Sequence, residues 1–200
     1  AQAAPPSPAF LHAERAYEAS LRSTTRRDVD TRTRFFLAGL LRERAWRLFD
    51  GQSPEARALH SRAAEVYRGI IDIDPHGASA ERAAYARILM VKEVHAFDET
   101  IGQGQNPCQT DDESICVVDS HVRRPWEDPL RQAEHPRPEI PYSAADGEML
   151  AAYADYVRVT PHTSPDRQRV LFLSAYLNLR RNHLDEARVD FEALLRNHDD

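Results

Sequence analysis

Apolar residues recur at intervals of three and four along most of the 200-residue chain, and polar residues stand between them. This spacing places the apolar side chains on one face of an α-helix. Only seven glycines are present, which is too few for a β fold with many tight turns. We therefore expect an all-α protein, with helices over about 8–22, 31–49, 54–74, 79–97, 148–159, 165–180 and 184–197.

Serine followed by proline marks the start of two of these helices, at Ser53-Pro54 and at Ser164-Pro165. A serine hydroxyl can accept a hydrogen bond from a free N–H group of the first turn, and proline fits the first helical position because its missing N–H has no partner there. Asp30 or Thr31 is expected to cap the second helix in the same way. The helix over 148–159 is expected to begin at Glu148.

The last two predicted helices are separated only by residues 181–183. A connection this short makes the chain turn back, so the two helices should pack antiparallel. The second helix begins with residues 184–187, and Phe191 follows four positions after Ala187. This hairpin resembles a tetratricopeptide repeat. The resemblance implies that Ala187 lets two helices approach closely and that Phe191 fills the groove between hairpins.

The resemblance covers about 53–100 and 145–198. In the first part, a small residue, an aromatic residue and a terminating proline stand at the family's spacing, as Ala63, Tyr67 and Pro75. The tyrosine, the proline and the histidine after it recur 86 residues later (from 67 to 153), as Tyr153, Pro161 and His162. Because 86 is not a multiple of the usual ~34-residue period, an insertion is expected between the two parts.

Three positions of the last hairpin depart from the family's pattern. Asp199 stands after the second helix, where the family usually has proline. Asn182 stands in the turn where the family usually has glycine. Asn178 stands where an aromatic residue is expected late in the first helix, and Tyr176 is the expected substitute for it. The fold implied by the resemblance is a short α-solenoid of stacked antiparallel hairpins.

The chain divides into four predicted parts. Residues 1–8 form a linker or disordered N-terminus, because alanine and proline dominate there. Residues 9–101 and 142–200 form helical hairpins of the same solenoid. Residues 102–141 form an irregular insertion, which is polar and rich in proline, aspartate and glycine and so cannot be one long helix.

The two cysteines, Cys108 and Cys116, both lie in the insertion, and an even, closely spaced pair predicts a local disulfide. With the Ala-Gln-Ala triplet at the start of the chain, this pair favours an exported, periplasmic location. The cysteines and the nearby His121 lack the paired spacing of zinc ligands, and the acidic residues around them lack the pattern of a calcium loop. We therefore expect neither a bound metal nor a cofactor.

Charge and hydropathy exclude other classes of partner. The net charge of −6 and the lack of a basic stripe argue against a nucleic-acid partner. No apolar run approaches the ~20 residues that would span a membrane. Motifs for a serine nucleophile, a zinc hydrolase, a phosphate loop or a dinucleotide are missing from the sequence. His76 and His162 are expected on the surface, in the turns after the two prolines, because no catalytic partner accompanies them.

By resemblance, the repeat family binds ligands on the concave surface formed by the first helix of each hairpin. Carried onto the last hairpin, this implies a protein-binding groove of Arg169, Phe172, Tyr176 and Arg180. Arginine and aromatic residues are common at interface centres, and arginine can donate two parallel hydrogen bonds to a carboxylate. The alternative is that Phe172 and Tyr176 are buried against a neighbouring helix.

These features together predict a non-catalytic scaffold for protein or peptide partners, as part of a larger assembly in the bacterial envelope. The chain stops after a hairpin without a polar capping helix, so further repeats or a second copy are also expected partners. Two alternatives remain open. One is an all-helical enzyme with a site under the 102–141 segment, and the other is a cytoplasmic peptide-binding adaptor.

Overall fold

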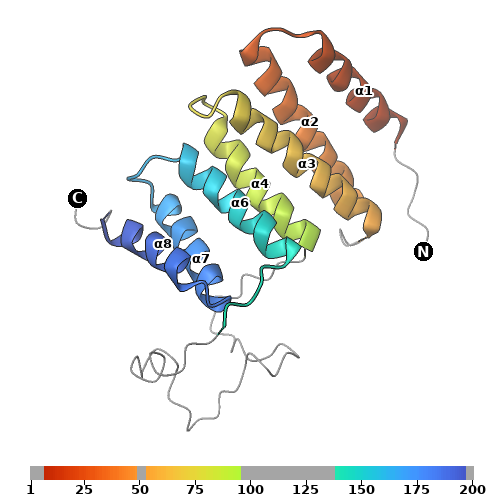
Figure 1. Ribbon diagram of the computed structural model, residues 1–200. Coiled ribbons are helices and arrows are strands. Elements are labelled where there is room, and N and C mark those ends of the chain that lie inside the picture. The colour runs from red at the N-terminus through yellow and green to blue at the C-terminus, as the bar shows by residue number, and fades with distance from the viewer. Residues whose placement is uncertain (1–6, 49–52, 96–137, 197–200) are drawn as a thin grey trace, which may run out of the picture. The chain divides into compact units, whose positions relative to one another are not determined.

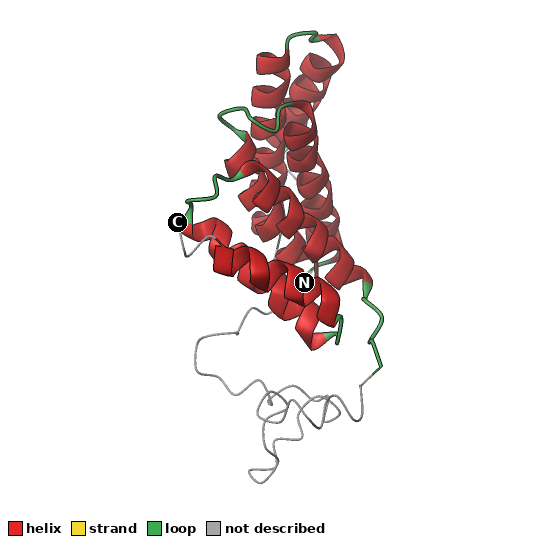
Figure 2. Ribbon diagram, turned by 60° about the vertical axis from the view of Figure 1, so that its left-hand side comes forward, coloured by secondary structure: helices red, strands yellow, loops and turns green. Residues whose placement is uncertain are grey.

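A computed structural model describes residues 7–48, 53–95 and 138–196 of the chain (Figure 1). Within these ranges every regular element is an α-helix and no strand is present (Figure 2). The helices belong to one compact unit, built from the described parts of residues 1–97 and 141–200. The all-α prediction is therefore confirmed.

Each predicted helix is present in the structure. The bounds are α1 (Pro8–Ser23), α2 (Arg27–Arg47), α3 (Pro54–Ile73), α4 (Ala80–His95), α6 (Ala144–Val159), α7 (Pro165–Arg180) and α8 (Leu184–Arg196). The Ser53 hydroxyl accepts a hydrogen bond of 3.1 Å from the N–H of Ala56, as predicted for the start of α3. Ser164 also stands at the N-cap of α7, but its side chain makes no capping hydrogen bond there.

The predicted starts of α2 and α6 were wrong. Asp30 and Thr31 lie inside α2, where Asp30 accepts a hydrogen bond of 2.6 Å from Arg34 instead of capping the helix. Helix α6 begins at Ala144, four residues before the predicted start, because Ser143 and Asp146 form a capping box. In this box each side chain satisfies a backbone N–H of the other residue, at 3.1 Å and 2.8 Å.

Each helix packs mainly against its neighbours in the chain, and the most extensive contacts join α2 to α3 and α3 to α4. Helix α4 packs on α6, α6 on α7 and α7 on α8, and α3 also touches α6. The helices thus form the hairpins α2–α3, α4–α6 and α7–α8, which stack on one another as predicted for an α-solenoid. The largest fully buried side chains are Tyr67, Tyr153, Leu41, Ile70, Ile71, Met90, Met149 and His60.

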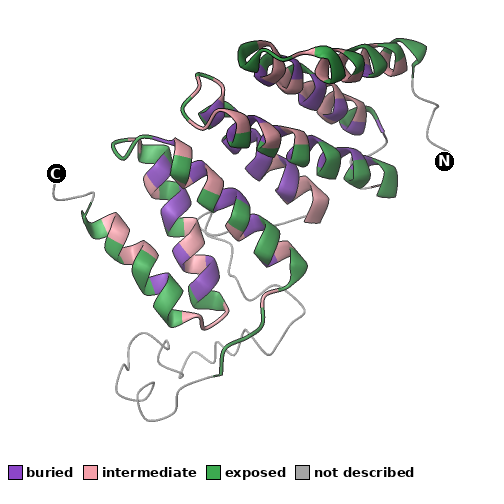
Figure 3. Ribbon diagram, turned by 45° about the horizontal axis from the view of Figure 1, so that its top comes forward, coloured by how far each residue is buried: buried purple, intermediate pink, exposed green. Residues whose placement is uncertain are grey.

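Burial is uneven along the stack, as Figure 3 illustrates. Helix α3 buries eight of its side chains between α2 and α4, whereas α8 buries only Ala187. Tyr67 and Tyr153 are buried as predicted, and Phe191 is partly buried. Because α8 packs mainly on α7, its other faces are largely exposed.

Helices α4 and α6 pack directly together, although residues 96–143 separate them in the chain. Arg87, which is almost fully buried on α4, forms an ion pair with Asp155 on α6. At the other end of the contact, His95 Nε2 lies 2.9 Å from a carboxylate oxygen of Glu148. The predicted insertion over 102–141 and its cysteines lie outside the described residues, apart from residues 138–141.

The turn between α7 and α8 is the predicted short antiparallel connection. Asn182 has a φ of 60°, a left-handed conformation that glycine adopts most readily. Asparagine tolerates this conformation better than most residues. The N–H groups of Arg181 and His183 bond to the last carbonyls of α7, those of Leu177 and Asn178. The turn therefore forms without a glycine.

Asn178 is buried, and its surroundings explain how a polar residue is accommodated at this position. Its side-chain oxygen accepts a hydrogen bond of 2.8 Å from the hydroxyl of Tyr142, which precedes α6. The Tyr142 ring stacks on His183 with the ring centres 4.0 Å apart. Tyr176 does not take this place, since it is partly exposed and stacks on Phe172.

Candidate binding pocket

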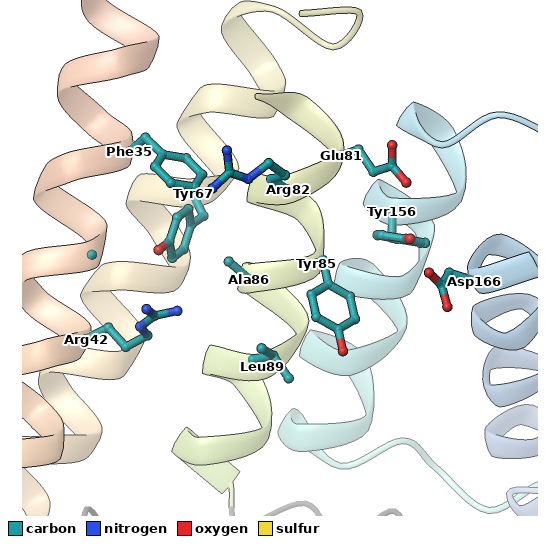
Figure 4. Close-up of a pocket in the computed structure, with 11 residues that line it drawn as sticks. Phe35, Arg42, Tyr67, Glu81, Arg82, Tyr85, Ala86, Leu89, Tyr156 and Asp166 are labelled. Atoms are coloured by element: carbon teal, nitrogen blue, oxygen red, sulfur yellow. The ribbon is translucent and has the colours of Figure 1, made fainter. Parts of the chain in front are cut away.

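A pocket of about 470 Å³ opens on the side of the stack where α2, α4 and α7 lie (Figure 4). These three helices are the first members of the three hairpins. Side chains of α3 and α6, the second helices of the first two hairpins, form its floor. This volume is within the range typical of ligand-binding pockets. We call it the α2–α4–α7 pocket.

Helix α2 contributes Phe35, Gly39 and Arg42 to the pocket. Their spacing of four and three residues places them on one face of the helix. A Cβ atom at Gly39 would have no other atom within 4 Å, so the pocket is open directly above the α2 backbone. A ligand can therefore approach the helix closely at this point.

Helix α4 runs across the middle of the pocket. Tyr85 is half exposed at its centre, and Ala86 and Leu89 supply apolar surface beside it. Glu81 and Arg82 are consecutive residues near the start of α4, and Figure 4 shows their side chains on opposite sides of this helix. Helix α4 therefore divides the pocket into two halves.

The half next to α2 is positively charged. The Arg82 guanidinium lies 5.0 Å from the centre of the Phe35 ring, and that of Arg42 lies 5.0 Å from the centre of the Trp46 ring. Within the described part of the chain, neither arginine has a carboxylate in ion-pairing range, and the buried Nε of Arg42 has no hydrogen-bond partner. Both guanidinium groups thus remain available to an anionic group.

Tyr67 forms the floor of this half and is nearly completely buried. Burial raises the pKa of its hydroxyl, and the positive charges of Arg42 and Arg82 partly offset that increase. The hydroxyl therefore stays protonated at neutral pH and can donate a hydrogen bond. Together with the two arginines it places three hydrogen-bond donors in one half of the pocket.

The half next to α7 is negatively charged. Glu81 of α4 and Asp166 of α7 lie around Tyr156, which forms the floor. Burial is the main cause of a raised pKa at Tyr156, the nearby Thr160 side chain opposes it, and the two carboxylates add to it. Neither carboxylate has a basic side chain in ion-pairing range among the described residues. Both are exposed to solvent and available to a cationic group.

The groove residues predicted on α7 lie outside this pocket, which α7 lines only through Asp166. Arg169 and Arg180 are exposed, Phe172 is 44% exposed and Tyr176 is partly exposed. The Phe172 ring stacks on Tyr176 and meets Phe191 edge-on, with centroid distances of 6.3 and 6.2 Å. The two aromatic residues are thus brought together at a surface beside α8, and their role in partner binding stays a prediction.

Sequence reasoning did not single out the pocket residues on α2 and α4. Phe35, Arg42 and Arg82 belong to no motif in the sequence. The order of the helices is a signal that could have found them. If α2 and α4 are assigned as the first helices of their hairpins, the concave surface predicted on α7 extends to both of them. The prediction was instead confined to the last hairpin, where the turn is short and the pairing of helices is evident.

Other candidate chemistry was located where the structure describes it. His76 and His162 are exposed in turns, as predicted. Among the described residues no cluster of three or more histidine, cysteine or acidic side chains could hold a metal ion. The same residues include no helix with the length and apolar character needed to cross a bilayer. The predicted Cys108–Cys116 disulfide lies outside the described residues.

Comparison with protein-family models, curated proteins and solved structures gave no match for this chain. The resemblance to tetratricopeptide repeats therefore stays a prediction from the residues that suggested it.

Proposed function

We propose that this protein is a non-catalytic interaction scaffold that holds an extended segment of a partner protein in the α2–α4–α7 pocket. The observation that carries the proposal is the presence of unpaired charges and exposed aromatic surface on consecutive hairpins. Tyrosine and arginine are the residues most enriched at energetically important interface positions. Stacked helix hairpins also expose a large surface for their size, because each hairpin contacts only its neighbours.

The composition of the pocket favours binding over chemistry. Its described lining offers arginine, tyrosine, carboxylate and apolar side chains, without a nucleophile held next to a base. The pocket is open and formed by rigid helices, so an extended chain can enter it from the side. Such a site suits the recognition of a peptide segment better than the enclosure of a reacting molecule.

Gly39 allows a direct test. Gly39→Phe should fill part of the pocket, because a Cβ atom at this position faces open space. Gly39→Ala is the matched control, since it also removes the glycine but adds only one methyl group. Partners captured from the envelope fraction of the source cell by the wild-type chain and by Gly39→Ala should be lost with Gly39→Phe. If Gly39→Phe captures the same partners with equal yield, the pocket is not the binding site.

We also propose that the protein acts outside the cytoplasm, as part of an envelope assembly. The closely spaced Cys108 and Cys116 support this location, because disulfides persist in oxidising compartments. Titration of the purified native protein with a thiol reagent under denaturing conditions is expected to find no free thiol. Two free thiols would remove the argument for export and favour the cytoplasmic adaptor.

A further inference from the structure

The two halves of the α2–α4–α7 pocket carry opposite charges that cancel. Arg42 and Arg82 supply two positive charges on the α2 side of α4, and Glu81 and Asp166 supply two negative charges on the α7 side. Figure 4 shows the two pairs separated by Tyr85. A uniformly acidic or basic ligand would gain attraction in one half and meet repulsion in the other. The charge pattern therefore selects a ligand that is itself bipolar.

We propose that the segment bound in this pocket carries an acidic side chain that lies between Arg42 and Arg82 and a basic side chain that lies between Glu81 and Asp166. This inference rests on the proposed function and names the chemistry of the partner segment. The acidic group accepts hydrogen bonds from the two guanidinium groups and from the Tyr67 hydroxyl. A residue between the two charged side chains packs on the exposed ring of Tyr85.

The width of the pocket sets the spacing of the two charges in the ligand. The halves lie on the two sides of one helix, and helices pack about 8–10 Å apart. An extended chain advances about 3.3 Å per residue. The acidic and basic side chains are therefore expected about three residues apart. A helical ligand would need a different spacing, because its rise is only about 1.5 Å per residue.

A carboxylate fits the positive half better than a phosphate group. A phosphoryl group carries nearly two negative charges at neutral pH, so its stronger attraction to Arg42 and Arg82 is offset by stronger repulsion from the neighbouring Glu81 and Asp166. The planar guanidinium groups match the geometry of carboxylates and phosphates alike, so the preference rests on this balance of charge. A phosphopeptide that bound more tightly than its acidic counterpart would contradict the proposal.

The direct test uses short fluorescent peptides with the full chain. The reference peptide carries glutamate and arginine three residues apart with two leucines between them. The comparison peptides carry glutamine in place of both charges, phosphoserine in place of glutamate, or the two charges one residue apart. Fluorescence anisotropy should give at least about tenfold tighter binding for the reference peptide than for the glutamine peptide, as for close charge pairs at other interfaces. Added salt should weaken the binding of the reference peptide more than that of the glutamine peptide, because salt screens the charge pairs.

A matched protein variant exchanges the charges of α4 without altering its composition. In Glu81→Arg/Arg82→Glu both changed residues are exposed and the net charge stays the same, so the fold should be kept. Each half of the pocket then contains one charge of each sign, because Arg42 and Asp166 are unchanged. This variant should lose the preference for the reference peptide over the glutamine peptide.

The outcomes separate this inference from the proposed function. Equal binding of the reference and glutamine peptides, blocked in both cases by Gly39→Phe, would overturn the charge assignment and leave the peptide-binding pocket in place. An unchanged charge preference in Glu81→Arg/Arg82→Glu would also overturn it. If the Trp126→Phe chain is used, the emission of Trp46, which lies against Arg42, should change when the reference peptide binds. No change in that emission on saturation would place the acidic side chain elsewhere.

Discussion

Replacing His60 by leucine should stabilise this protein and reduce the loss of stability below neutral pH. His60 lies on the inner face of α3 and is fully buried. Neither of its ring nitrogens has a hydrogen-bond partner among the described residues. A neutral imidazole contains one donor and one acceptor, so both polar groups have lost their water without a replacement.

The expected gain follows from that missing compensation. An unsatisfied buried polar group costs about 1–3 kcal/mol, and His60 contributes two such groups. Leucine has a similar volume and no polar atoms, and a hydrophobic change of shape in a core typically costs less than about 1.5 kcal/mol. Even at the low end of these ranges the two groups cost more than the change of shape, so His60→Leu should raise the free energy of unfolding at neutral pH by at least about 0.5 kcal/mol.

The pH dependence has a definite sign. Burial lowers the pKa of His60 below its ordinary value of 6.5, although the nearby charge of Glu93 partly opposes that shift. Below pH 6.5 the unfolded chain binds a proton at this position that the folded protein excludes, so acid favours unfolding. The stability that neutral His60 contributes above its pKa in the unfolded chain is therefore lost as the pH falls toward its lower pKa in the folded protein. The loss approaches about 1.4 kcal/mol per pH unit in that window.

Urea unfolding followed by circular dichroism at several pH values between roughly 7 and 5 measures both effects. His76→Leu is the control, since that histidine is exposed and should change neither the stability nor its pH dependence. Wild-type protein and His76→Leu should lose stability in parallel as the pH falls, and His60→Leu should lose less. A lower stability of His60→Leu at neutral pH, or an acid-side slope equal to that of the wild type, would refute the reasoning.

Three further predictions concern other parts of the structure. Gly39→Ala should raise the free energy of unfolding by about 0.5–1 kcal/mol, because alanine favours the helix and its methyl group contacts no other atom. A less stable variant would show that the methyl group clashes with a neighbouring atom. Glu14→Gln should lower the free energy of unfolding by about 1–3 kcal/mol, because Glu14 is buried between Arg62 and Arg44, with 3.1 Å to the latter. The matched change at the half-exposed Glu43, Glu43→Gln, should alter it by less than about 0.5 kcal/mol. Arg169→Glu/Arg180→Glu should weaken partner capture without changing the melting temperature, since both side chains are exposed; unchanged capture would remove the predicted α7 groove from the binding surface.

The helices could be predicted from the sequence because each of them needs an apolar face, and that requirement is written in its own residues. The starts were less accurate where local hydrogen bonds decide them. Glycine disfavours a helix, so Gly147 led to a predicted start of α6 that is too late. The hydrogen bonds between Ser143 and Asp146 outweigh that preference and start the helix earlier. Helix α2 begins without a side-chain cap, so no residue type marks its first turn.

The pocket could not be predicted in the same way. Periodicity shows that Phe35 and Arg42 share a face of α2, but it does not show which helix lies opposite them. Arg82 reaches the same half of the pocket only because α3 holds α2 and α4 at a fixed distance and rotation. The charge of a single residue is also uninformative until its partners are known. Most arginines that the structure describes have a carboxylate or an aromatic ring nearby, and the absence of a carboxylate at Arg42 and Arg82 is visible only in three dimensions.

The meeting of α4 and α6 has a consequence for how this chain can change over evolution. His95 and Glu148 are in contact, so the two ends of the hairpin are within reach of a connection of only a few residues. The entropy of closing a longer connection rises only slowly with its length. The segment between these two ends can therefore be lengthened, shortened or exchanged while the hairpins keep their packing. The connection between α4 and α6 is thus a site where insertions are tolerated.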